Sequence, residues 1–149
     1  MNPIVMLTKQ HRAVEALFKK IENAKRADQR RALLGELASD LTLHMQIEEK
    51  IFYPAVKELE TKKAEEMVLE AYEEHAVVKL VLAELPKIDP EDERFEAKMT
   101  VLQELIEHHV EEEEDEMFKL AKKIDGDDLE MIGERMTAEM GRAKGRAAA

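Results

Sequence analysis

Two stretches of sequence decide how this chain folds: HMQIEEKIFYP, which begins at His44, and HVEEEEDEMF, which begins at His109. In each stretch a glutamate follows the histidine four residues later, Glu48 in the first and Glu113 in the second. Residues four apart on an α-helix lie on the same face, one turn from each other. Each stretch therefore predicts a helix that presents an imidazole and a carboxylate on one face.

Four of the five histidines recur at nearly regular intervals. They are His11, His44, His75 and His109. The intervals are 33, 31 and 34 residues, with midpoints at positions 27.5, 59.5 and 92. These midpoints lie at or beside three expected turns, the charged break at 25–28, the helix cap at Thr61 and the loop around Pro90. Because equal heights on antiparallel helices are equally far from the turn, the spacing predicts four histidines at one level of a bundle.

The apolar residues around these histidines recur with helical spacing, so we expect an all-α protein. The predicted architecture is an antiparallel up-down-up-down four-helix bundle over residues 1–124. Its fourth helix is expected from about 91 to 123, and Pro54 is expected to kink the second. A short fifth helix over 125–141 packs on the bundle, and 142–149 is expected to be a flexible tail.

The composition narrows the function further. Of the 149 residues, 44% are hydrophobic and 38% are charged, and the net charge is −11. So acidic a chain is not expected to bind nucleic acid or an anionic membrane. The chain has no apolar run of membrane-spanning length and no signal-peptide pattern, so a cytoplasmic location is expected. Because there is no cysteine, any metal must be held by nitrogen and oxygen ligands.

The predicted ligands are four imidazoles and two carboxylates at one level of the bundle, which suits a pair of metal ions, most plausibly iron. They are His11, His44, Glu48, His75, His109 and Glu113. A single histidine on an apolar stripe is more often an ordinary core residue, but a buried cluster of this kind would be costly without a cation. Glu114 is the alternative to Glu113. A tyrosine hydroxyl, that of Tyr53 or of Tyr72, could also approach the metals. Glu49 is expected to face outward or to support the site, and His108 to do the same.

Two other metal-site classes lack their signatures. A ferritin-like centre needs a Glu-x-x-His pair on two helices, and the residues three before the evenly spaced histidines are not glutamates. A zinc protease needs HExxH, which does not occur in the chain.

The stretches HMQIEEKIFYP and EHHVEEEEDEMF resemble the hemerythrin family, specifically the bacterial HHE cation-binding domains, and the resemblance spans residues 4–122. It implies a non-haem di-iron centre in which Glu48 and Glu113 bridge the two irons. In oxygen-carrying hemerythrins a further histidine follows one turn after the third-helix histidine, where this chain has Lys79. Their last carboxylate typically follows five residues after the fourth-helix histidine, which keeps Glu114 as an alternative.

The resemblance implies a protein that binds O₂ or a related small ligand for sensing, carriage or storage. The smaller ligand set argues against simple reversible oxygen carriage. The alternatives are a di-iron enzyme acting on peroxide or nitric oxide, and an iron-handling protein.

Overall fold

The computed structural model describes residues 1–148, and every regular element within them is helical. The all-α class predicted from the sequence is therefore confirmed. In chain order the elements are α1 (Pro3–Asn23), α2 (Ala27–Ile47), η1 (Glu48–Phe52), α3 (Tyr53–Lys57), α4 (Lys62–Glu84), η2 (Leu85–Lys87), α5 (Glu93–Glu112), η3 (Glu113–Met117), α6 (Phe118–Ala121) and α7 (Gly126–Ala148).

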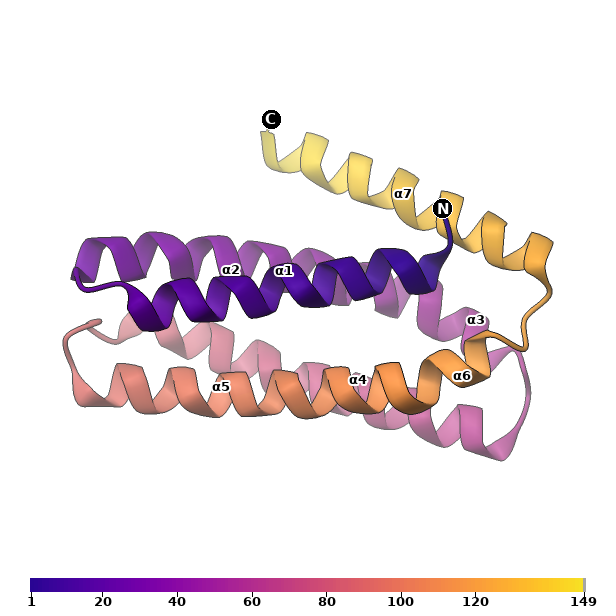
Figure 1. The fold of residues 1–149 in the computed structure, drawn as a ribbon, viewed down its shortest axis with the longest axis horizontal. Helices are drawn as coiled ribbons and strands as arrows, with labels where there is room; N and C mark the ends of the chain where they lie inside the picture. Colours follow the sequence, from indigo (N-terminus) through magenta and orange to yellow (C-terminus); the bar gives the residue numbers. More distant parts are fainter. Residues whose placement is uncertain (149) are drawn as a thin grey trace.

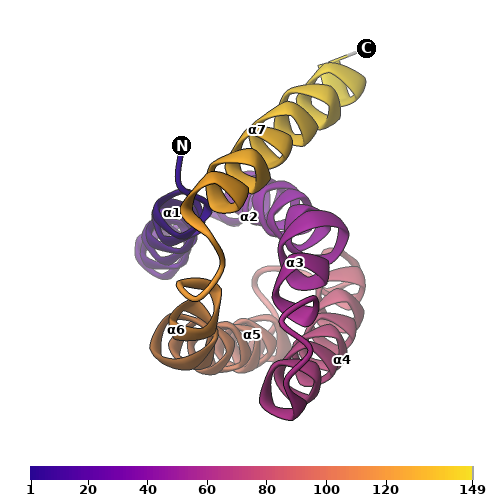
Figure 2. The same cartoon turned by 90° about the vertical axis from the view of Figure 1, so that its right-hand side faces the viewer.

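Helices α1, α2, α4 and α5 lie along one common long direction, and the chain turns back between successive members of the set (Figure 1). Seen from one end, the same helices surround a shared interior, with α7 outside the ring (Figure 2). The turns at 24–26, 58–61 and 85–92 lie close to the midpoints between the histidines. This arrangement brings the inward faces of all four helices to the same interior.

Side-chain caps explain where two of these helices begin. The Asn2 side chain accepts a hydrogen bond of 2.8 Å from the backbone N–H of Ile4, and Pro3 occupies the first turn of α1. Thr61, the cap expected for the third long helix, accepts a hydrogen bond of 3.1 Å from the backbone N–H of Ala64. Each cap satisfies a backbone donor that the first helical turn leaves free.

The second and fourth long helices each contain a π-helical segment that the sequence did not predict. In η1 the N–H of Tyr53 donates to the carbonyl of Glu48, and in η3 the N–H of Phe118 donates to the carbonyl of Glu113. Both bonds span five residues instead of four. Pro54 has no N–H to donate, which explains the wider turn in η1 but not in η3. The fourth long helix nevertheless runs without a break from Glu93 to Ala121, close to the expected 91–123, with the π-helical turn of η3 inside it.

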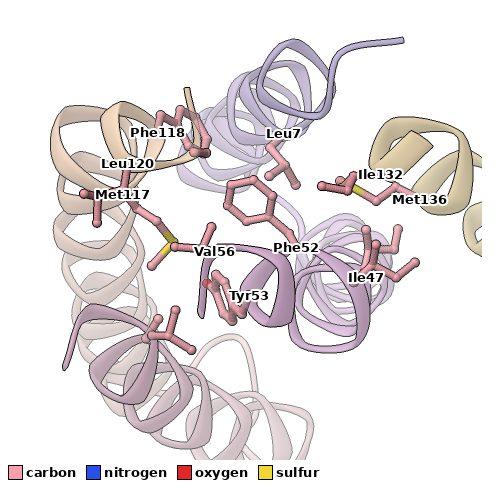
Figure 3. Packing of buried hydrophobic residues seen from close by; sticks show 14 of the residues in the cluster. Leu7, Ile47, Phe52, Tyr53, Val56, Met117, Phe118, Leu120, Ile132 and Met136 are labelled. Atoms are coloured by element: carbon pink, nitrogen blue, oxygen red, sulfur yellow. The ribbon is translucent and has the colours of Figure 1, made fainter. Parts of the chain in front are cut away.

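The buried hydrophobic residues form two clusters, one toward each end of the bundle. One cluster includes Leu7, Ile47, Phe52 and Met117, and Figure 3 shows Leu7 and Phe52 next to each other, with Met117 on one side of them and Ile47 on the other. The other includes Leu17, Leu37, Leu82 and Leu102. Along each long helix the inward histidine lies between residues of the two clusters, so a buried polar layer divides the hydrophobic core.

Helix α7 is longer than the short fifth helix expected from the sequence. It continues through 142–148, which were expected to form a flexible tail, and Ala149 lies outside the described residues. Its Ile132 and Met136 are buried against the bundle. A Cβ atom on Gly133 would lie 1.7 Å from the carbonyl oxygen of Met1, so only glycine permits the N-terminus to lie this close.

Among the described residues, no helix combines the length and the apolar character that crossing a membrane requires.

Candidate metal centre

Six side chains from all four long helical segments meet in the polar layer. They are His11, His44, Glu48, His75, His109 and Glu113. All are buried, with exposed fractions of 0 to 6%. These are the six residues that the sequence predicts as metal ligands, and the structure brings all of them together. Their role as ligands stays a prediction.

Glu113 lies between the histidines of two different helices. Its Oε1 atom is 3.2 Å from Nε2 of His11, and its Oε2 atom is 3.3 Å from Nε2 of His109. The two oxygens of this carboxylate therefore face two different imidazoles, an arrangement that allows one carboxylate to bridge two cations.

Glu48 is also shared, but through one oxygen. Its Oε1 atom is 3.0 Å from Nε2 of His44 and 3.3 Å from Nε2 of His75. Potential ligand atoms within 4.8 Å of one another form two groups. The groups are His11, His44, Glu48 and Glu113, and Glu48, His75 and His109. The donor atoms thus form two neighbouring groups, each able to hold a cation, and Glu48 is common to both.

The atoms at the centre have too few hydrogen-bond partners. Nε2 of His11, both carboxylate oxygens of Glu48 and Oε1 of Glu113 are buried and have no hydrogen-bond partner among the described residues. Leaving one buried polar group without a partner costs about 1–3 kcal/mol, and a charged group costs more. Divalent cations would interact with all four atoms and offset the buried negative charge. Because every donor is an imidazole nitrogen or a carboxylate oxygen, the residues fit divalent cations such as iron, manganese or zinc.

The two carboxyl groups differ in their acidity when only the chain is considered. Burial and the nearby charge of Glu113 raise the pKa of Glu48 to about 7. Burial alone would raise the pKa of Glu113 as well, but its contacts with Glu48, His109 and His11 hold that pKa well below the usual range. Burial and the positive charge of His109 lower the pKa of His75 to about 4. Perturbations in opposite directions within one cluster are typical of functional sites.

Each of the four imidazoles makes a second contact, through Nδ1, with a side chain on another helical segment. The pairs are His44 with Gln10 at 2.6 Å, His75 with Glu49 at 2.9 Å, His109 with Glu74 at 2.7 Å and His11 with Glu114 at 2.7 Å. In each pair except the last, the acceptor lies on the segment before the histidine, and the last pair closes the ring. A carboxylate acceptor requires the Nδ1–H tautomer, which leaves Nε2 free to bind a cation.

These acceptors are adjacent in sequence to the central residues of another helix. Gln10 and Glu74 immediately precede a histidine of the site, and Glu49 and Glu114 immediately follow a glutamate of the site. The spacing of the histidines gave no reason to select Gln10 or Glu74. Their position directly before His11 and His75 could have indicated that they lie near the centre. Glu114, the alternative ligand, instead contacts the outward-facing Nδ1 atom of His11.

Tyr53 reaches the centre from the end of η1. Its hydroxyl donates a hydrogen bond of 2.8 Å to Oε2 of Glu113 and lies 3.1 Å from Nε2 of both His75 and His109. Burial and the charges of Glu113 and Glu48 raise the pKa of this phenol well above its usual value. The other candidate, Tyr72, donates to the backbone carbonyl of Glu49 and does not reach the centre.

The family is shown by the sequence itself. The profile of the Hemerythrin HHE cation binding domain matches residues 2–121. The chain therefore belongs to this family.

One solved structure with the same domain name and several proteins of known sequence are similar to the chain. The crystal structure of a Hemerythrin HHE cation binding domain-containing protein from Mycobacterium kansasii, a homolog of Rv2633c, has a TM-score of 0.86 and 29% sequence identity, and the match covers 99% of this chain and 90% of that one. The uncharacterized protein Rv2633c of Mycobacterium tuberculosis is 26% identical over 97% of this chain and 89% of its own length. A DNA nickase from Nostoc sp. is 26% identical over 79% of this chain, but this chain spans only 33% of that protein.

Proposed function

We propose that the chain is a non-haem di-iron protein that binds O₂ or a related small ligand. The observation that carries the proposal is the sharing of Glu48 and Glu113 between imidazoles of different helices. Two cation positions with common carboxylates are expected to lie about 3.5–4 Å apart, the usual spacing in two-metal sites. Iron ions held there would supply reversible electron transfer and open coordination positions.

A small cavity beside the imidazoles supports binding of a small ligand. It has a volume of about 10 Å³ and is lined by all four central histidines together with apolar residues, among them Val14, Leu41 and Ile106. A volume of about 10–15 Å³ holds one water-sized molecule. The apolar lining favours a small uncharged ligand and disfavours a larger polar substrate.

Tyr53 favours the second candidate function, an enzyme that acts on peroxide or nitric oxide. Its raised pKa keeps the phenol protonated at neutral pH. The hydroxyl can therefore donate a hydrogen bond within the buried layer, as it does to Glu113. Lys79, which stands in place of a further histidine, points to Glu49, with its Nζ atom 2.9 Å from Oε2, and is half exposed. Repeated turnover of peroxide or nitric oxide by the iron-loaded protein would establish the enzyme, whereas binding without turnover would establish the first function.

We also infer an up-down-up-down bundle over 1–124, with 125–141 packed on it as a separate helix. A cytoplasmic location and the absence of a nucleic-acid partner are part of the same proposal, because the chain is acidic and contains no cysteine.

The proposal is tested by metal analysis of the wild-type protein and of four single variants. Glu48→Gln and Glu113→Gln each remove a shared carboxylate charge, so each should lose at least one of two bound iron ions and unfold at a lower temperature. Glu111→Gln and Glu116→Gln, which change exposed residues of the same acidic run, should keep both. A single tetrahedral zinc ion in the wild-type protein, or equal losses in all four variants, would overturn the proposal.

A further inference from the structure

A second group of metal-binding side chains lies on the surface, outside the buried centre. Glu70 and Glu74 are four residues apart on α4, and His108 and Glu112 are four residues apart on α5. Each pair occupies one face of its helix. One potential ligand atom from each of the four residues lies within 4.8 Å of the others. Two such pairs on neighbouring helices form a four-donor set.

The chemistry of this group favours a divalent cation. Nε2 of His108 is 3.2 Å from Oε1 of Glu112 and 3.6 Å from Oε2 of Glu74. One imidazole with three carboxylates suits manganese, iron or zinc. One histidine cannot balance three carboxylate charges, whereas a divalent cation can do so in part.

Glu74 connects the surface group with the buried centre. While its Oε2 atom faces His108, its Oε1 atom accepts a hydrogen bond of 2.7 Å from Nδ1 of His109. A single carboxylate thus belongs to the surface group and also orients an imidazole of the centre.

An independent observation is a cavity between α4 and α5. It has a volume of about 40 Å³ and is lined by Glu70, Glu74 and Glu112 of the surface group and by His109 and Glu113 of the centre. Glu113, which is 1% exposed, and His109 bring two groups of the buried centre into the wall of this cavity. The volume is sufficient for a water-sized species. The surface group and the centre therefore border one continuous space.

We propose that Glu70, Glu74, His108 and Glu112 bind a divalent cation and form the position from which metal passes into the buried centre. This proposal rests on the proposed two-metal function. The cation exchanges water for surface carboxylates first, and then moves between α4 and α5 to the buried donors.

The first test is a titration of metal-free protein with Mn²⁺, in which free Mn²⁺ is followed by electron paramagnetic resonance. The wild-type chain should bind a third, weaker equivalent beyond the two of the centre. The double variant Glu70→Gln/Glu112→Gln should lose that equivalent or bind it at least tenfold more weakly. The matched control Glu107→Gln/Glu111→Gln removes the same charge from exposed positions of α5 and should behave as wild type. Identical titrations for both double variants would overturn the surface site.

The second test measures the rate at which metal-free protein takes up Fe²⁺ without oxygen. Uptake should slow about tenfold in Glu70→Gln/Glu112→Gln and in His108→Ala, while the final content stays at two irons per chain. Unchanged rates would overturn the role as a route, even if the surface site binds Mn²⁺. A wild-type chain that binds only one Mn²⁺, lost in the first double variant, would instead support the surface site and refute the two-metal centre.

Discussion

At the scale of single residues, Tyr53 has the most informative position. A phenol that donates to Glu113 and lies beside two imidazoles restrains the carboxylate that lies between His11 and His109. We expect Tyr53→Phe to keep the fold, because only the hydroxyl is removed. Support to a metal ligand of this kind is worth about tenfold to 100-fold in metal affinity. Competition with a coloured chelator should therefore remove iron at a correspondingly lower chelator concentration.

The matched control is Tyr72→Phe. This hydroxyl donates to the backbone carbonyl of Glu49 and forms no hydrogen bond with a side chain of the centre. Its loss should leave the chelator competition close to that of wild type. Equal weakening in both variants would mean that the aromatic packing around the site is responsible and that the hydrogen bond to Glu113 is not.

The central histidines and glutamates were predictable because helical spacing fixes the face on which a residue lies. His44 with Glu48, and His109 with Glu113, needed only the rule of four residues. Tyr53 was harder to place, because five residues along a regular α-helix rotate a side chain about 140° away from Glu48. The π-helical turn alters this geometry, and nothing in the spacing of apolar residues indicates it.

At the scale of elements, both π-helical segments begin at a shared glutamate of the site. Pro54 explains only η1, since η3 forms without a proline. The common feature is the glutamate itself, and π-helical turns occur frequently at functional sites. We infer that each wider turn forms because it places a glutamate of the centre, and the residues after it, in the buried layer.

The seam between α1 and α5 leads to a prediction about ligand access. A groove of about 450 Å³ lies along this seam, and Ile106 and Val110 line both the groove and the small cavity beside the histidines. Ile106 and Val110 thus separate the groove from the cavity. Replacing Ile106 with phenylalanine crowds the side chains there, and such overpacking typically costs about 1–3 kcal/mol. If opening a path between these side chains carries that cost, nitric oxide should bind at least about fivefold more slowly, since each 1.36 kcal/mol is a factor of ten in rate. Stopped-flow spectroscopy of iron-loaded protein measures this rate.

The control for the seam is Val101→Phe, which places the same side chain at an exposed position of α5 that lines neither space. It should bind nitric oxide at the wild-type rate, and Ile106→Ala should bind it faster. If all three variants keep the wild-type rate, the small ligand reaches the cavity by another path.

At the scale of the whole molecule, a buried polar layer separates two hydrophobic clusters. The nearly equal histidine intervals predicted this layer, since residues equidistant from a turn meet at one height. The length of α7 was not predictable in the same way. The ending GRAKGRAAA contains two glycines that weaken a helix and several alanines that favour one, so local propensity does not decide where α7 ends.

The same layer makes the metal-free molecule respond to pH through opposing groups. The pKa of His75 is lowered to about 4 from 6.5, so its contribution to stability falls as pH decreases from 6.5 to 4. The pKa of Glu48 is raised to about 7 from 4.5, so its contribution grows as pH decreases from 7 to 4.5. The two slopes oppose each other over the shared range, which predicts little net change between pH 4.5 and 6.5.

Above pH 6.5 the metal-free and iron-loaded molecules should diverge. Despite their burial, contacts with Glu113 raise the pKa of both His11 and His109, so in metal-free protein their stabilising protons are lost as pH rises beyond 6.5. Iron needs the same histidines deprotonated, so metal binding strengthens over that range and stabilises the fold. Thermal unfolding between pH 6.5 and 8 should therefore show a falling Tm without metal and a steady or rising Tm with iron. If the two Tm curves instead rise in parallel, His11 and His109 are already neutral without metal, and Glu113 does not hold protons on them.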